Sequence, residues 1–226
     1  MNQAQWTAVD DYITSALVRP DAILDAVLRA CEAAGLPPAN VSPNQGKLLQ
    51  LLARMHGARA ILEIGTLGGY SAIWLARALP PGGRLLTLEV DAAHADVARA
   101  NFALAGLTGV IELRVGPALE TLPRVAAERA VPFDLIFIDA DKQHNPEYFA
   151  WALRLSRRGT VIIVDNVVRA GAVLDAASDD PSVQGVRRLN EQLAREPRVS
   201  AVAFQTVGSK GYEGMALVLV TADPES

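Results

Sequence analysis

Residues that could bind a metal ion follow two neighbouring apolar runs in the second half of the sequence. Asp139, Asp141 and Lys142 come directly after the first run, and Asp165 and Asn166 come directly after the second. This set offers carboxylate and amide oxygens without sulfur or imidazole, which is the ligand chemistry of Mg²⁺, Mn²⁺ and Ca²⁺. Aspartates at strand ends also cap helices, and the spacing alone leaves both interpretations open.

A glycine-containing segment between Glu63 and Ser71 has the composition of a ligand-binding turn. Its glycines, Gly65, Gly68 and Gly69, allow backbone amides to approach a ligand closely. Their spacing lacks the G-x-G-x-x-G order of a dinucleotide pyrophosphate site, and the carboxylate of Glu63 would repel phosphate but attract an ammonium group. The segment therefore favours a cationic cofactor that carries an amino acid over NAD.

One carboxylate, Glu89, follows the glycine segment by about twenty residues and ends the next apolar run. A carboxylate at that position can accept hydrogen bonds from both hydroxyls of a ribose. Together, the glycine segment and Glu89 indicate a nucleoside cofactor. A tight turn with solvated carboxylates at the strand ends is the alternative interpretation.

These residues require a scaffold that brings the ends of several apolar runs together. From Ala60 onward, short runs rich in Ile, Leu and Val alternate with helical patterns. This alternation predicts an α/β fold with a doubly wound parallel sheet, which binds ligands at the carboxyl ends of its strands. The predicted strands are Ala60–Ile64, Arg84–Val90, Val110–Val115, Phe133–Ile138 and Thr160–Val164. The helical patterns between them are Tyr70–Leu79, Ala92–Ala105, Ala118–Arg129 and Pro146–Leu155.

The last part of the chain predicts a different strand pairing. A helix at Pro181–Arg195 precedes two strands, Ser200–Val207 and Gly214–Val220. A turn over residues 208–213 would join these strands into an antiparallel hairpin. The expected sheet is therefore seven-stranded and mostly parallel, with an antiparallel closing hairpin.

Helical periodicity dominates the N-terminal part of the chain. Ser42 and Gln45 form a capping box around Pro43, and Gly57 suits the C-terminal end of the same helix. We expect a single domain over residues 1–226. It would consist of a helical N-terminal extension over residues 1–58 and an α/β core over residues 59–226 that binds cofactor and metal.

The composition limits the partners and the compartment. The chain has 226 residues, 50% of them hydrophobic, and a net charge of −4 without runs of Lys or Arg, which argues against a nucleic-acid partner. No apolar stretch has the length of a signal peptide or a membrane span, so we expect a cytoplasmic protein without a membrane partner. The one cysteine, Cys31, cannot form an internal disulfide bond.

Four ordered segments resemble the caffeoyl-CoA and catechol O-methyltransferase family, and in particular its bacterial members. They are Ile61–Ser71, Gly116–Leu119, Phe133–Lys142 and Val164–Asn166, and the resemblance extends over about residues 5–220. It implies a class I methyltransferase of Rossmann-like fold that uses S-adenosylmethionine (SAM) and a divalent cation, Mg²⁺ or else Mn²⁺ or Ca²⁺. It further implies a homodimer and a small aromatic acceptor with vicinal hydroxyls, of catechol, phenylpropanoid or flavonoid type.

By motif position, the resemblance assigns one set of residues to the cofactor. Glu63, Gly65 and Ser71 would hold its methionine end. Glu89 would accept hydrogen bonds from the ribose, and Ala118 would lie beside the adenine. The full set of expected cofactor contacts is Val41, Glu63, Gly65, Thr66, Ser71, Glu89, Ala118 and Asp139.

The same resemblance assigns Asp139, Asp165 and Asn166 as metal ligands and Lys142 as the general base. A bound cation would lower the pKa of an acceptor hydroxyl and fix its position, and Lys142 would remove the proton. Three protein ligands on a six-coordinate cation leave positions for a chelating pair of substrate oxygens. A solvated Lys142 in an ion pair with Asp141 is the alternative.

The sequence departs from the family pattern where the walls of the substrate pocket are expected. Arg169 stands two residues before Gly171, where many relatives carry Trp, and the turn over residues 208–214 is longer than the Gly-Asp-Gly-rich turn of many relatives. These departures concern the identity of the substrate and leave the reaction type unchanged. Near the same walls, we expect His144 on a loop surface, whereas Tyr212 either reaches a pocket or covers the hairpin.

Two other classes of function stand beside this interpretation. A NAD-dependent oxidoreductase would share the doubly wound architecture, but the glycine spacing and Glu63 disfavour it. A non-catalytic binding module would leave the carboxylates and Lys142 without a role.

Overall fold

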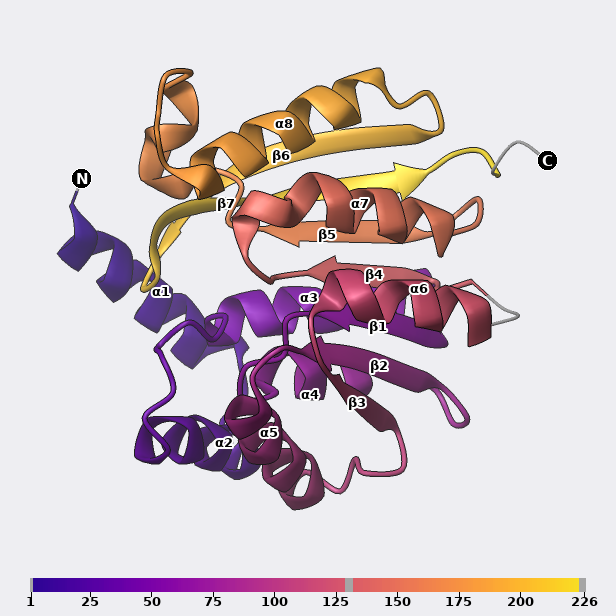
Figure 1. The fold of residues 1–226 in the computed structure, drawn as a ribbon. Coiled ribbons are helices and arrows are strands. Elements are labelled where there is room, and N and C mark those ends of the chain that lie inside the picture. The colour runs from indigo at the N-terminus through magenta and orange to yellow at the C-terminus, as the bar shows by residue number, and fades with distance from the viewer. Residues whose placement is uncertain (1, 129–131, 224–226) are drawn as a thin grey trace.

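The computed structural model describes residues 2–128 and 132–223, and one seven-stranded sheet runs through them (Figure 1). The strand order is β3-β2-β1-β4-β5-β7-β6. Strands β1 to β5 pair in parallel, and β7 is antiparallel to both β5 and β6. The strands are β1 (Ala60–Ile64), β2 (Arg84–Glu89), β3 (Ile111–Val115), β4 (Leu135–Ile138), β5 (Val161–Asp165), β6 (Val199–Gly208) and β7 (Gly211–Val220). The predicted α/β class and the closing hairpin are confirmed.

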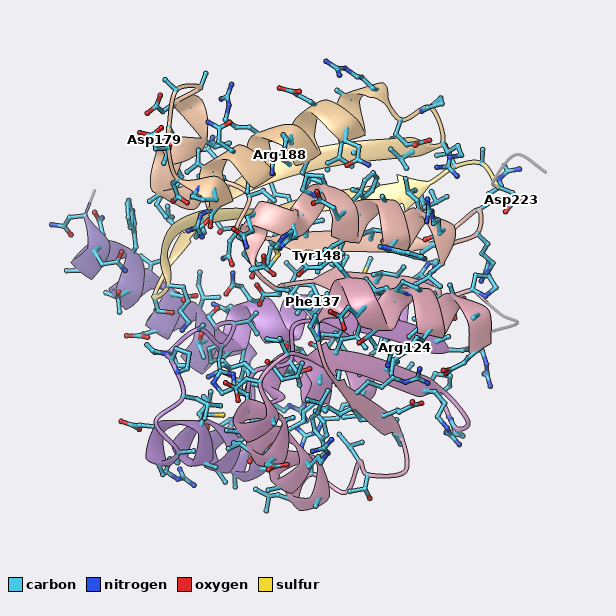
Figure 2. The ribbon with its side chains drawn as sticks, in the orientation of Figure 1. Arg124, Phe137, Tyr148, Asp179, Arg188 and Asp223 are labelled. Carbon is cyan, nitrogen blue, oxygen red and sulfur yellow. The ribbon has the colours of Figure 1, made fainter. Side chains whose placement is uncertain are left out.

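Helices cover both faces of the sheet because successive strand residues point to opposite faces. In β4, Leu135 and Phe137 belong to one hydrophobic cluster, and Ile136 and Ile138 belong to the other. The first cluster packs under α3, α4 and α5, and the second packs under α6, α7 and α8, which Figure 1 shows on one side of the sheet. Phe137 lies fully buried at the centre of the molecule, whereas exposed residues such as Arg188 lie at its periphery (Figure 2).

The helices begin and end largely where the sequence signals predict. They are α1 (Gln3–Leu17), α2 (Ala22–Ala33), α3 (Pro43–His56), α4 (Tyr70–Ala76), α5 (Ala92–Leu104), α6 (Ala118–Glu128), α7 (Asn145–Arg154) and α8 (Pro181–Arg195), with 3₁₀ turns η1 (Lys142–His144) and η2 (Arg169–Leu174). At α3, both hydrogen bonds of the capping box between Ser42 and Gln45 are present, and Gly57 ends the helix with a φ of 68°. The predicted helix end at Arg129 lies outside the described residues.

The hairpin turn near the C-terminus differs from the sequence-based expectation, and helix α1 lies against that hairpin. Helix α1 forms a separate element without a buried residue, and it contacts the β6–β7 hairpin through Gln3 and Asp10. The hairpin turn is shorter than predicted, because Gly208 pairs with Gly211 and only Ser209 and Lys210 lie between the strands. The turn over residues 208–213 was therefore a wrong prediction. None of the helices in the described ranges is long and apolar enough to cross a membrane.

The order of the strands changes direction between β1 and β4, and this is where a doubly wound sheet opens a crevice. The chain leaves β1 at Gly65 with a φ of 99°. A Cβ atom on Gly65 would lie 2.5 Å from the carbonyl oxygen of Asp139, which follows β4. Glycine at this position therefore lets the ends of the two strands come close together.

Candidate active site

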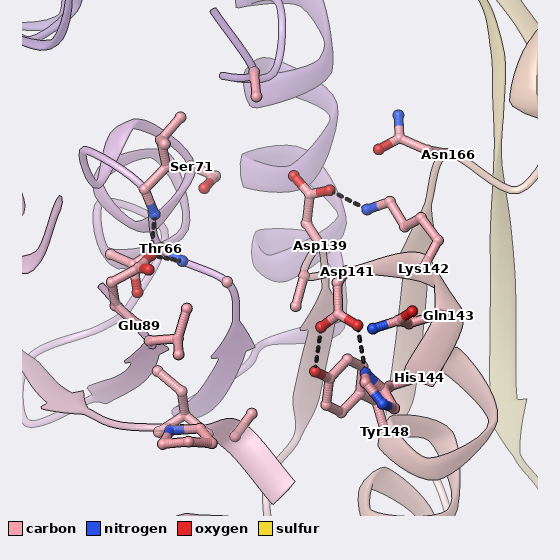
Figure 3. Close-up of a pocket in the computed structure, with 18 of the residues that line it drawn as sticks. Thr66, Ser71, Glu89, Asp139, Asp141, Lys142, Gln143, His144, Tyr148 and Asn166 are labelled. Carbon is pink, nitrogen blue, oxygen red and sulfur yellow. Dashed lines mark hydrogen bonds and ion pairs between the residues drawn. The ribbon is translucent and has the colours of Figure 1, made fainter. Parts of the chain in front are cut away.

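A cavity of about 640 Å³ opens at the carboxyl ends of β1 to β4 (Figure 3). It collects most of the residues that the sequence assigns to a cofactor, although they lie far apart along the chain. Those on its wall are Val41, Gly65, Thr66, Ser71, Glu89, Ala118 and Asp139. Lys142 and Asn166 also line this larger cavity. The sheet therefore brings together the groups that the sequence analysis treated separately.

Glu89 fixes the glycine turn against the end of β2. Its Oε2 accepts hydrogen bonds from the backbone N–H groups of Thr66 at 3.2 Å and Leu67 at 2.7 Å. Its Oε1 accepts from the N–H of Asp91 at 2.9 Å. A carboxylate offers about four acceptor positions, so these bonds leave capacity for a ligand hydroxyl. The backbone bonds were not anticipated from the sequence.

Glu63 does not reach the wall of the larger cavity. It is fully buried, and its carboxyl oxygens accept hydrogen bonds from the hydroxyls of Ser71 and Thr87, each at 2.6 Å. Burial, with smaller contributions from the charges of Asp139 and Glu89, raises the pKa of Glu63 to about 8, although the hydrogen bonds from the two hydroxyls oppose the shift. Glu63 therefore lies behind Ser71, and Ser71 lines the cavity.

The expected metal ligands meet where the larger cavity adjoins a second one of about 480 Å³. Asp139 lines the larger cavity, Asp165 lines the smaller one, and Asn166 lines both. Burial, together with the charge of Asp139, raises the pKa of Asp165 to about 7, and the charge of Lys142 opposes the shift. Among the described residues, no three His, Cys, Asp or Glu side chains gather as a metal-ligand cluster. The predicted set has two carboxylates and an amide as its third ligand.

Lys142 pairs with Asp139 rather than with Asp141. Its Nζ lies 2.6 Å from Asp139 Oδ1, and its side chain is 9% exposed. The alternative of a solvated lysine paired with Asp141 is therefore wrong, because 3₁₀ turn η1 directs Lys142 back toward the end of β4 (Figure 3).

Asp141 is held by two aromatic side chains instead. The hydroxyl of Tyr148 donates to its Oδ1 at 2.5 Å, and Nδ1 of His144 contacts its Oδ2 (Figure 3). Both rings line the larger cavity. His144 is partly exposed, as expected for a loop residue, but it also contributes to the cavity wall. Tyr148 was missed, and its place on the buried face of a predicted helix was the available signal.

Two further residues from the sequence analysis take distinct places. Arg169 lines both cavities, and its backbone N–H donates to Glu213 Oε2 at 3.0 Å. Tyr212 covers the hairpin, because its hydroxyl donates to Gln205 and its ring packs against Trp6 at 6.5 Å between centroids. The departure at Arg169 therefore does fall on a pocket wall.

Known proteins match this chain along most of its length. A family model described as O-methyltransferase matches residues 14–219. The chain is 53% identical over 220 residues to a catechol O-methyltransferase of Niastella koreensis, and the match covers 97% of this chain and 100% of the relative.

Solved structures agree with the family match. The O-methyltransferase from Bacillus cereus in complex with SAH is 58% identical with a TM-score of 0.96, over 97% of this chain and 100% of that one. The O-methyltransferase TomG from Streptomyces achromogenes, involved in tomaymycin synthesis and solved with SAM, is 52% identical with a TM-score of 0.95, over 98% and 100% of the two chains.

The alternative of a NAD-dependent oxidoreductase gains no support from these matches. The family model matches residues 14–219, which include every residue that lines the larger cavity. The chain therefore belongs to the O-methyltransferase family of enzymes.

Proposed function

We propose that this chain transfers the methyl group of SAM to one hydroxyl of a catechol-type aromatic acceptor, with the aid of a divalent cation. The observation that carries this proposal is the meeting of Asp139, Lys142, Asp165 and Asn166 at the junction of the two cavities. The name of the Niastella koreensis relative supports a catechol acceptor. The SAH and SAM in the Bacillus cereus and Streptomyces achromogenes structures support the cofactor.

The larger cavity suits SAM in volume and in the groups on its wall. Its volume of about 640 Å³ lies within the range of small-molecule sites. Gly65 and Thr66 present backbone groups, Glu89 retains acceptor capacity for ribose hydroxyls, and Ala118 offers an apolar surface to a base. Bound SAM supplies an electrophilic methyl group on a sulfonium. A cationic ligand nearby would favour the ionised form of the buried Glu63 carboxyl, which suits the methionine ammonium close to Ser71.

The ligand chemistry of the junction suits a divalent cation of the Mg²⁺ type. Asp139 and Asp165 are close enough for the charge of one to raise the pKa of the other, and Asp165 is 3% exposed. Two carboxylates in so little solvent repel each other, and a cation between them removes that repulsion. Asn166 adds a neutral oxygen ligand. A bound cation would act as a Lewis acid toward the acceptor hydroxyl.

Lys142 is positioned to take the proton of that hydroxyl. Lys142 lines the larger cavity, and its Nζ forms an ion pair with Asp139 Oδ1 at 2.6 Å, which requires the ammonium form. A cation bound to Asp139 would compete for that carboxylate and favour the neutral amine. The neutral amine could then accept the proton of the hydroxyl, and burial of the side chain limits the access of bulk water to Nζ. The cytoplasmic location expected from the sequence stays a prediction.

Methyl transfer with and without chelator tests the proposal. Purified protein should methylate a simple catechol with SAM and Mg²⁺, and excess EDTA should remove at least about 99% of the rate while leaving the circular dichroism spectrum unchanged. Added Mg²⁺ should restore the rate. Full activity of metal-stripped protein, or of Asp165→Ala, would contradict the role of the cation.

A further inference from the structure

The smaller cavity, of about 480 Å³, adjoins the cofactor cavity at the expected metal ligands. Three separate segments enclose it: helix α1, the loop over residues 38–42 with the start of α3, and the β6–β7 hairpin. Asp165 and Asn166 lie on its wall, and Asn166 and Arg169 are shared with the larger cavity. A group bound in the smaller cavity would therefore adjoin both the metal ligands and the cofactor.

Apolar side chains from each of the three segments line this cavity. Ile13 comes from α1, Val41 and Leu48 come from the loop and α3, and Val207 comes from the hairpin. Such walls suit the faces of an aromatic ring, which is the group that the proposed function requires. The polar groups on the same wall then decide which substituents the ring can carry.

Two acidic side chains on the wall of the smaller cavity, Asp10 and Glu213, already have hydrogen-bond partners in the protein. Asp10 accepts hydrogen bonds from the backbone N–H of Ser209 at 3.0 Å and from its hydroxyl at 2.7 Å, and also from Asn44. Glu213 accepts from the backbone N–H of Arg169 and lies 4.0 Å from its guanidinium. These contacts occupy both carboxylates, and Glu213 partly balances the charge of Arg169, whose buried Nε has no hydrogen-bond partner in the described part of the chain.

Lys210 differs from these residues because it has no carboxylate partner within 4.0 Å in the described part of the chain. It stands in the two-residue hairpin turn, and its Nζ donates to the carbonyl oxygen of Pro38 at 2.7 Å. Lys210 lines the smaller cavity together with Asp165 and Asn166. Partial desolvation lowers the pKa of Lys210, and the charge of Asp139 opposes that shift. An ammonium has three donors, and a neutral carbonyl is a weaker partner for it than a carboxylate is.

We propose that Lys210 is a specificity-determining residue that selects aromatic acceptors carrying a carboxylate. The ring would lie between the apolar walls with its vicinal hydroxyls at Asp165 and Asn166, and its carboxylate would bind the Lys210 ammonium. This inference rests on the proposed function and narrows its substrate class from catechols in general to catechol acids.

Matched acid and ester acceptors test this selection. We choose 3,4-dihydroxybenzoate and caffeate, which differ in reach, and compare each with its uncharged methyl ester. The affinity of each acceptor is measured by calorimetry in the presence of SAH and Mg²⁺, and kcat and KM are measured with SAM. The wild-type protein should favour at least one acid over its ester by about tenfold in both affinity and kcat/KM, as expected for one charged hydrogen bond.

Variants of the lysines separate a specific contact from a general charge effect. Lys210→Gln should abolish the preference by raising the Kd and KM for the acid, with kcat and the ester values unchanged, and Lys210→Arg should retain it. Lys47→Gln removes the same charge from α3, where Lys47 bonds to Gln50 outside both cavities, and should change nothing. Melting temperatures of all variants should remain within about 2 °C of the wild type, because these positions lie outside the core.

The outcomes distinguish this inference from the function on which it rests. Methylation of acids and esters with equal affinity and efficiency would overturn the selection by Lys210 and leave the methyltransferase proposal intact. A preference that survives in Lys210→Gln would also overturn it. Absence of methyl transfer to all four acceptors would overturn the proposed function, and this inference with it.

Discussion

The carboxyl group of Glu63 is the least solvent-exposed titratable group of the site, and its ionisation can be tested without any ligand. Burial raises its pKa to about 8 from an ordinary value of 4.5. Between these two pH values, the folded protein binds a proton here that the unfolded chain has released. The contribution of Glu63 to the free energy of unfolding therefore falls as the pH rises from 4.5 to about 8. The total decrease is on the order of 5 kcal/mol.

Glu63→Gln should remove that contribution, because an amide does not titrate. In urea denaturation of the cofactor-free protein between pH 5 and pH 8, the variant should lose less stability than the wild type as the pH rises. Glu120→Gln serves as the control, since Glu120 is exposed in α6. Parallel curves for Glu63→Gln and the wild type would show that Glu63 ionises normally in the folded state.

For single residues, the sequence predicted which side chains lie at the site better than it predicted their hydrogen-bond and ion-pair partners. Residues at the end of a strand or directly after it, such as Glu89 and Asp139, could be placed at the cavity because parallel strands end at one edge. The partner of Lys142 depends on the path of a 3₁₀ turn, and the partners of Glu89 depend on the shape of the glycine turn. Residue spacing does not determine either of these.

The contact between α1 and the β6–β7 hairpin is the element-level feature that most affects the proposed acceptor cavity. Asp10 joins α1 to the hairpin turn through Ser209 and to α3 through Asn44. Helix α1 contributes no buried residue, so few other contacts hold it in place. An isolated helix of this length is marginal in water, and its order therefore depends on such tertiary contacts.

Asp10→Ala should loosen this part of the cavity wall without altering the cofactor site. We expect faster amide hydrogen exchange in residues 3–17 and 206–213, corresponding to about 1 kcal/mol of local opening free energy, together with a higher KM for the acceptor. The affinity for SAH should not change. Asp11→Ala is the matched control, because the neighbouring Asp11 is exposed. Exchange that is equally fast in both variants would contradict the role of Asp10.

The elements themselves show which signals a sequence carries. The capping box of α3 and the bounds of α8 were predictable because local hydrogen bonds and Pro181 define them. The hairpin was predicted with too long a turn, because Tyr212 and Glu213 are polar and were assigned to the loop. They continue β7 because this part of the strand extends beyond β5 and pairs with Thr206 and Val207 of β6.

On the scale of the whole molecule, an apolar surface remains exposed along β6 and α1. Val202 is 56% exposed and Phe204 is 38% exposed on the edge strand, and Tyr12 and Leu17 are each 71% exposed on α1. Exposed edge strands with apolar side chains tend to pair with another chain. This surface supports the homodimer that the family resemblance implies, which we keep as a proposal.

Light scattering of the purified protein should give twice the mass of the 24.0 kDa chain at micromolar concentration. Val202→Lys should shift the protein to the monomer, because it places a charge within the proposed interface. The exposed residue Met55 lies on α3 away from this strand, so Met55→Lys should leave the dimer intact. A monomeric wild-type protein would contradict the proposal.

The arrangement of the whole chain was predictable to a greater degree than its surfaces. Alternating apolar runs predicted the parallel part of the sheet, whereas the order of the strands is known from the structure and was not predicted. The smaller cavity could not be predicted, because Asp10, Pro38 and Lys210 meet there from distant parts of the chain. The division into an extension over residues 1–58 and a core over residues 59–226 stays a prediction.

The central claim is that the acceptor chelates a cation held by Asp139, Asp165 and Asn166, and it is tested most directly by removing one hydroxyl from the acceptor. Chelation by two adjacent oxygens would hold the reacting hydroxyl in place, whereas a single hydroxyl could rotate away. Methylation rates with SAM and Mg²⁺ should therefore be at least about a hundredfold higher for caffeic acid than for coumaric acid, with the same affinity for SAH in both cases. Comparable rates for the two acids would contradict chelation and point to a base that acts without the metal.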